Sequence, residues 1–157
     1  MDIYLVCNKG TTSIFDKLIK IIKQHSTDHI PKHKEIDPEI EKKYTHVGLC
    51  QLNVIPTEGT ITYYACREDA GVMEYTESVE DLDLYKINLN TVDWEVINNF
   101  YNNSWIREGS MITDMGYPLL AKPHTMGSVE WVAIALNLAF PKKYSITKLI
   151  NFAQLEE

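Results

Sequence analysis

The sequence predicts an α+β fold in which an antiparallel sheet packs against helices. Short β-forming runs dominate the first ninety residues, with one helical segment between the first two runs, and the strongest apolar helices come last. No strand–helix–strand unit recurs, so nothing in the pattern favours a parallel sheet. At 157 residues the chain is expected to form a single domain that spans residues 1–157.

The first predicted strand runs from Ile3 to Cys7 and stops at the turn signal Asn8-Lys9-Gly10. An amphipathic helix follows over residues 14–22, because its isoleucines and leucine fall on one helical stripe. Residues 24–43 are polar and contain two prolines, which predicts a long exposed loop. The next buried strand is expected over residues 44–49.

The strand Thr60–Cys66 is expected to pair with the His46 strand as an antiparallel hairpin after the turn at residues 56–59. Gly71-Val72 opens another short extended piece. Leu84–Leu89 alternates apolar and polar residues, as a half-exposed strand does. The acidic residues between these pieces are interpreted as a solvated face.

Three helices are predicted in the second half of the chain. Asn90-Thr91 is expected to cap a helix that runs to about Trp105. A dense apolar helix begins at Ser128 and ends before Pro141. A last short helix is expected over Ile146–Gln154.

Composition excludes several classes of function. The net charge of −7 disfavours nonspecific binding to nucleic acid or to an anionic membrane. No apolar run reaches 18 residues and the first residues lack the basic start of a signal peptide, so neither a transmembrane segment nor secretion is expected. Cys7, Cys50 and Cys66 are interpreted as reduced core residues of a cytoplasmic protein.

No metal or other cofactor is expected. The chain has no Cys-x-x-Cys motif. His25, His29 and His33 recur at four-residue intervals, but no carboxylate or cysteine stands at ligand spacing among them.

His46 and Ser128 are the residues that suggest chemistry. Strand alternation puts His46 on one face with Gly48 and Cys50, whereas Val47 and Leu49 fall on the other. Ser128 follows Gly127 at the start of the apolar helix. A histidine on a strand and a hydroxyl at a helix start form a base–nucleophile pair if the fold brings them together. The alternative is a core histidine and a helix-capping serine.

Six pieces of the sequence, in order, carry a family resemblance. They are Asp2-Ile3-Tyr4-Leu5-Val6, Thr12-Ser13-Ile14, Thr45-His46-Val47-Gly48-Leu49, Ile61 to Cys66 with Gly71-Val72, Gly116-Tyr117, and Ser128-Val129-Glu130-Trp131-Val132. This series resembles the circularly permuted, papain-like branch of the NlpC peptidase superfamily, which includes bacterial and poxviral proteins and relatives of lecithin–retinol acyltransferase. The resemblance covers nearly the whole chain and implies a permuted papain-like fold.

The resemblance also implies a thiol hydrolase acting as an amidase, peptidase or acyl transferase on a peptide, amide or acyl substrate. The residue at position 128 would attack the carbonyl, His46 would move the proton, and the backbone amide of residue 128 would help to stabilise the oxyanion. Glu130 matches the glutamate of the family and is expected to serve the helix start. Tyr117 matches the bend before the nucleophile helix.

Two departures from the family pattern indicate altered chemistry. Serine stands at position 128 where the family has cysteine. The family also places an acid, amide or histidine on the next strand to orient the catalytic histidine, and Tyr64-Ala65-Cys66 supplies none of these. Tyr64 and Glu68 remain the candidates for that orienting role.

Three explanations of the serine stay open. The protein is a catalytically dead viral or phage-type relative that engages a protein partner through its cleft or acidic surface, a serine variant with an unrecognised orienting residue, or an engineered inactive form. A viral protein of this kind would work in the host cytoplasm. The sequence leaves the oligomeric state open.

Overall fold

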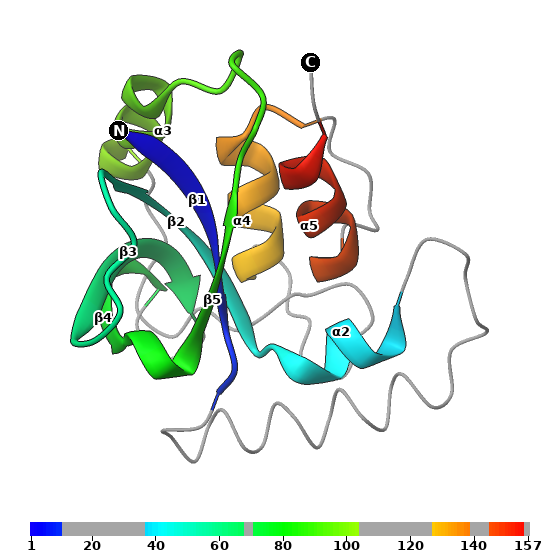
Figure 1. Ribbon diagram of the computed structural model, residues 1–157. Helices are drawn as coiled ribbons and strands as arrows, with labels where there is room; N and C mark the ends of the chain where they lie inside the picture. The colour runs from blue at the N-terminus through cyan, green and yellow to red at the C-terminus, as the bar shows by residue number, and fades with distance from the viewer. Residues whose placement is uncertain (11–36, 68–70, 104–126, 139–144, 156–157) are drawn as a thin grey trace.

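The computed structural model describes residues 1–10, 37–67, 71–103, 127–138 and 145–155 (Figure 1). The strands are β1 (Asp2–Asn8), β2 (His46–Leu52), β3 (Thr60–Arg67), β4 (Gly71–Ser78) and β5 (Leu82–Lys86). The helices are α2 (Pro38–Lys43), α3 (Trp94–Asn103), α4 (Ser128–Ala135) and α5 (Ile146–Gln154), with a 3₁₀ turn, η1 (Val79–Asp81). None of the helices in these ranges is long and apolar enough to cross a membrane.

The strands form one five-stranded sheet in the order β4-β3-β2-β1-β5, and all neighbours are antiparallel. The predicted α+β class with an antiparallel sheet is therefore confirmed. β1 occupies an inner position, with β2 on one side and β5 on the other; Asn8 is level with both His46 and Leu82. β1 therefore joins β5 to the rest of the sheet.

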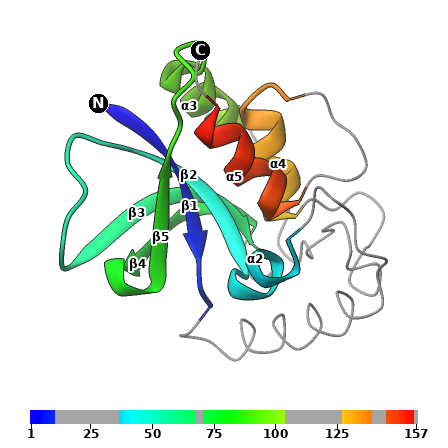
Figure 2. The same ribbon diagram turned by 45° about the vertical axis from the view of Figure 1, so that its right-hand side comes forward.

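One face of the sheet is covered by helices. Leu5, Val47 and Leu49 project from it into an apolar core that includes Trp131 of α4 and Leu149 of α5. Figures 1 and 2 show α4 and α5 side by side over this face. Burial of this shared face is the main reason that the apolar helices pack here.

The opposite face is enclosed by the curl of the sheet itself. Tyr4, Val6, Cys50, Tyr63 and Ala65 are buried on this face. Only η1 lies between β4 and β5, so the two edge strands meet at that end of the sheet (Figure 2). The fold therefore has two buried compartments, one between sheet and helices and one inside the curl.

The cysteines fit this division. Cys7 and Cys66 lie in the core under the helices, whereas Cys50 lies inside the curl. All three are buried and none forms a disulfide, as the sequence predicts. Burial raises the pKa of the Cys50 thiol to about 12, because the apolar surroundings disfavour the thiolate.

The structure differs from the predicted elements in three places. Residues 38–43 form α2 rather than a loop, since Asp37 caps this helix by accepting a hydrogen bond from Glu39 N (3.0 Å) and Pro38 suits its first turn. α3 begins at Trp94 because Asp93, rather than Asn90, provides the cap, with Oδ1 2.9 Å from Glu95 N.

The third difference lies in the strands at the two edges of the sheet. β4 extends from Gly71 to Ser78 because every residue in it pairs with β3. β5 spans Leu82–Lys86 and so begins earlier than expected, since Leu82 is buried against the core inside the curl.

Several sequence predictions fall outside the described residues. These are the helix over residues 14–22, the loop over residues 24–36 with its three histidines, the bend at Gly116-Tyr117, and Glu68. Of the six candidate site residues, the structure therefore describes Ser128, His46, Tyr64 and Glu130.

Candidate functional site

Ser128 is the first residue of α4, as the sequence predicts, and is only 1% exposed. Gly127 occupies the N-cap position, and its carbonyl accepts the hydrogen bond from Trp131 N at 3.1 Å. The Ser128 hydroxyl contacts β2: its Oγ accepts a hydrogen bond from the backbone N–H of Val47 at 3.4 Å. The start of α4 is therefore fastened to the strand that carries His46.

The contact between Ser128 and Val47 is possible because β2 and β3 are not paired at Val47. β2 pairs with β3 at Leu49↔Tyr64, whereas its pairing with β1 continues to His46. Val47 lies two residues before Leu49, so its N–H points to the same side as that of Leu49, toward β3. The Ser128 oxygen occupies the place that a β3 carbonyl would take in a continuous ladder.

His46 begins β2 and is fully buried. By strand alternation its side chain projects on the Cys50 face, inside the curl, whereas Val47 faces the helices. Its opposite neighbour on β1 is Asn8, whose Nδ2 donates to the Tyr63 hydroxyl at 3.2 Å. The structure thus brings Ser128 to the backbone beside His46, while the imidazole belongs to the compartment inside the curl.

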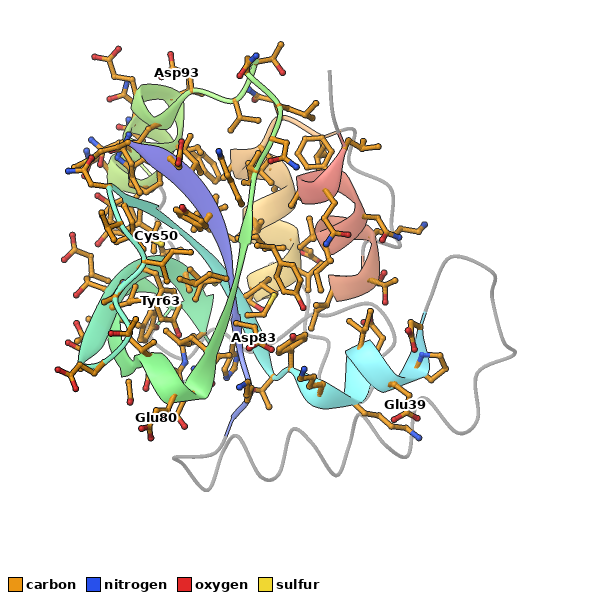
Figure 3. The ribbon with its side chains drawn as sticks, in the orientation of Figure 1. Glu39, Cys50, Tyr63, Glu80, Asp83 and Asp93 are labelled. Carbon is orange, nitrogen blue, oxygen red and sulfur yellow. The ribbon has the colours of Figure 1, made fainter. Side chains whose placement is uncertain are left out.

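Gly48 shows how tightly that compartment is packed. A Cβ atom at this position would lie 2.5 Å from the Tyr63 ring and 2.4 Å from the Tyr64 carbonyl oxygen. Only glycine leaves room for the Tyr63 ring, which Figure 3 shows near Cys50. The glycine of the His-Val-Gly motif therefore has a packing role next to His46.

Tyr64 projects toward the helices and so lies on the opposite face from His46. Its ring stacks between Trp94 and Tyr101 of α3, with centroid distances of 5.3 Å and 3.8 Å. Its hydroxyl donates to Asn98 Oδ1 at 2.7 Å. Burial, together with the nearby Glu74 carboxylate, raises the pKa of Tyr64. The structure therefore does not bring Tyr64 to His46.

Arg67 is the residue of β3 that comes level with His46 when the register is continued from Leu49↔Tyr64. Its guanidinium pairs with Glu77 (Nη1–Oε1 2.8 Å) and lies 4.8 Å from the centre of the Tyr75 ring. A guanidinium has only donors, so it cannot accept the imidazole N–H that an orienting residue must receive. The sequence analysis missed Arg67 because it considered only the three preceding residues of this strand, Tyr64-Ala65-Cys66.

Glu130 lies in the first turn of α4 and is partly buried. A carboxylate there interacts favourably with the positive end of the helix dipole. Its position agrees with the expected role at the helix start.

A second polar cluster surrounds Asp83, and no local sequence pattern indicated it. The Tyr44 hydroxyl donates to Asp83 Oδ2 at 2.5 Å and lies 2.8 Å from the Tyr85 hydroxyl. Lys9 and Lys43 approach the same carboxylate at 3.4 Å and 3.3 Å. Figure 3 shows Asp83 on β5, beside the chain that enters β2.

These neighbours determine the ionisation of the cluster. Burial opposes ionisation of Asp83, but the Tyr44 hydrogen bond and the two ammonium groups outweigh it, and the pKa of Asp83 lies below its usual range. Burial and the adjacent carboxylate raise the pKa of Tyr44. The sequence suggested that Asp83 belongs to a solvated acidic face. The structure shows instead that Asp83 is partly buried in a polar cluster.

Within the described part of the chain, no group of three potential ligands is arranged to hold a metal ion. No family model, no curated protein and no solved structure matches this chain. Its function therefore has to be inferred from the geometry around Ser128 and His46.

Proposed function

We propose that the protein has the scaffold of a permuted papain-like thiol hydrolase with serine at the nucleophile position, and that it binds a protein partner rather than hydrolysing amides or esters. The observation that carries this proposal is the Ser128 hydroxyl, which lies buried at the start of α4 and accepts the Val47 N–H. The family resemblance implies a nucleophile helix start that faces the histidine side chain. Here the helix start contacts the backbone of the histidine strand.

The difference between sulfur and oxygen supports the loss of hydrolysis. A thiol at a helix start beside an imidazole ionises readily, because the dipole and the imidazolium both favour thiolate. A serine hydroxyl gains far too little from the same surroundings and needs a base held in place by a third group. Among the described residues, Tyr64 and Arg67 are not arranged to provide that group.

The burial of the described pair disfavours hydrolysis. Ser128 and His46 are almost completely buried and belong to the packed interior, so in this state they add stability rather than a reactive surface. The net charge of −7 favours a partner with a basic surface. The partner would engage the acidic surface of the scaffold.

The thiol test uses Ser128→Cys. We expect this variant to react with iodoacetamide at pH 7 at least about tenfold faster than Cys50, whose pKa near 12 keeps it protonated. Adding His46→Ala should remove most of the gain. Alkylation rates measured from pH 5 to 10, with the modified residue located by peptide mass spectrometry, check both statements.

Ser145→Cys is the matched control, because Ser145 is also buried at a helix start but lies next to the Glu41 carboxylate rather than a histidine. Equal reactivity at positions 128 and 145 would remove the hydrolase-derived part of the proposal. Ester or peptide hydrolysis by the unmodified protein that disappears in Ser128→Ala would overturn the binding part.

A further inference from the structure

A pocket of about 390 Å³ lies at the opposite end of α4 from Ser128. It is enclosed by the loop after β5, the start of α3, the end of α4 and one residue of α5. Figure 1 shows these segments together at the top of the view. The volume falls within the range of about 300–1,000 Å³ that is typical of small-molecule sites.

Most of the side chains that line this pocket are apolar, although polar groups contribute nearly half of its lining surface. The apolar side chains are those of Leu89, Val92, Val96, Ala135, Leu136, Leu138 and Phe152. Val96 is 44% exposed, whereas Leu136 is 6% exposed, so the pocket passes from an open rim to a buried floor. An apolar chain or ring placed here would lose contact with water on several sides.

Asp93 is the one charged side chain among the residues that line the pocket. Its Oδ1 caps α3 by accepting from Glu95 N at 2.9 Å, whereas its second carboxylate oxygen accepts no hydrogen bond from the described residues. Figure 3 shows Asp93 at the start of α3, at the top of the molecule. A negative charge therefore stands beside the apolar side chains of the pocket, whose other polar lining residues, Thr91 and Asn137, are neutral.

The end of α4 adds to this negative character. Asn137 adopts a left-handed conformation (φ 57°), and the helix closes through Asn137 N to Ile134 O (2.9 Å) and Leu138 N to Ala133 O (3.0 Å). The negative end of the helix dipole thus lies at the pocket. The start of α3 brings the opposite polarity, which the carboxylates of Asp93 and Glu95 offset.

We propose that this pocket binds a small hydrophobic amine. The apolar part would lie between Val92, Leu136 and Phe152, and the ammonium group would pair with Asp93. The inference is independent of the proposed function, because the pocket and Ser128 lie at opposite ends of α4.

Three probes of equal length test the proposal on the full chain: 4-phenylbutylamine, 4-phenylbutan-1-ol and 4-phenylbutyrate. Titrations followed by amide chemical shifts should give the tightest binding for the amine and the weakest for the carboxylate. The shifts should centre on residues 89–96 and 135–138.

Two variants separate charge from shape. Asp93→Asn keeps a capping acceptor but removes the charge, so it should weaken amine binding about two- to fivefold and leave the alcohol unchanged. Val96→Trp should block the rim and weaken all three probes. Glu80→Gln, an exposed acid outside the pocket, is the control for net charge and should change nothing.

The proposal is overturned if the amine does not bind, or if all three probes bind equally. It is also overturned if Asp93→Asn and Glu80→Gln have the same effect, since the amine would then respond only to overall charge. Retained folding of each variant is read from the dispersion of the same amide spectra.

Discussion

Helices α4 and α5 both begin next to a buried serine, yet the two helix starts are built differently. At α5, Ser145 is the N-cap and its hydroxyl accepts from Lys148 N at 3.1 Å. The Glu41 carboxylate closes the same start by accepting from Ile146 N (3.3 Å) and Thr147 N (2.9 Å). At α4, glycine occupies the cap and the Ser128 hydroxyl turns to the neighbouring strand.

The difference separates a structural helix start from a candidate functional one. α5 receives a negative charge from within the protein, and its first amides are occupied. The cap residue of α4 contributes no side-chain hydrogen bond. An active site needs helix-start amides that can receive a developing oxyanion. The start of α5 is already closed by Ser145 and Glu41, so α4 remains the candidate.

The largest effect is expected from Glu41→Ala, which should destroy the closure of α5. The buried carboxylate also accepts from the Thr147 hydroxyl at 2.5 Å, so its removal leaves several buried donors without a partner. We expect the free energy of unfolding to fall by about 3 kcal/mol. Urea denaturation followed by circular dichroism measures this change.

Glu39→Ala provides the control on the same helix, because Glu39 is exposed. It should leave the denaturation midpoint nearly unchanged. Equal losses from the two variants would mean that α2 contributes through helix propensity alone and that α5 does not depend on Glu41.

A smaller effect is expected when each serine loses its hydroxyl. Ser145→Ala removes an N-cap and should cost about 1 kcal/mol of unfolding free energy. Ser128→Ala leaves the Val47 N–H without its acceptor and should cost about 1–2 kcal/mol. Ser128→Ala with the stability of the unmodified protein would show that the bond to β2 does not hold the helix start.

The smallest loss of unfolding free energy is expected at Asp83. This carboxylate is partly exposed and can be compared with the buried carboxylate of Glu41. Asp83→Asn should cost only about 0.5–1 kcal/mol at pH 7, because its lysine partners are exposed to solvent. The lowered pKa means that Asp83 stabilises the fold above about pH 4 and loses this contribution as the pH falls through its folded-state value. Denaturation curves of both proteins should therefore converge at low pH.

Local patterns predicted much of the described fold. Ile146–Gln154 and the start at Ser128 were predicted at the observed residues, because a serine precedes or opens a dense apolar segment in each case. The antiparallel pairing of β2 with β3 follows from two β-forming runs around a turn. These features depend on neighbours in the sequence.

The features that were missed depend on residues far apart in the chain. α2 is charged and contains proline, and it is fixed by the contact of Glu41 with Thr147. The candidate site likewise has features that the sequence predicted and features that it did not. Helix start and histidine strand were recognisable, but the insertion of Tyr64 between two rings of α3 was not, because it requires the folded position of that helix.

The inner position of β1 sets the order in which the protein can be completed during synthesis. β1 leaves the ribosome before its partners β2 and β5, so Tyr4 can pair with Lys86 only after the chain has been synthesised through β5. Such distant pairings form slowly, since a long loop must close before they contribute. A nascent chain that ends before Leu82 therefore carries a hydrophobic strand with one edge uncovered, and it is this intermediate that a chaperone would have to shield.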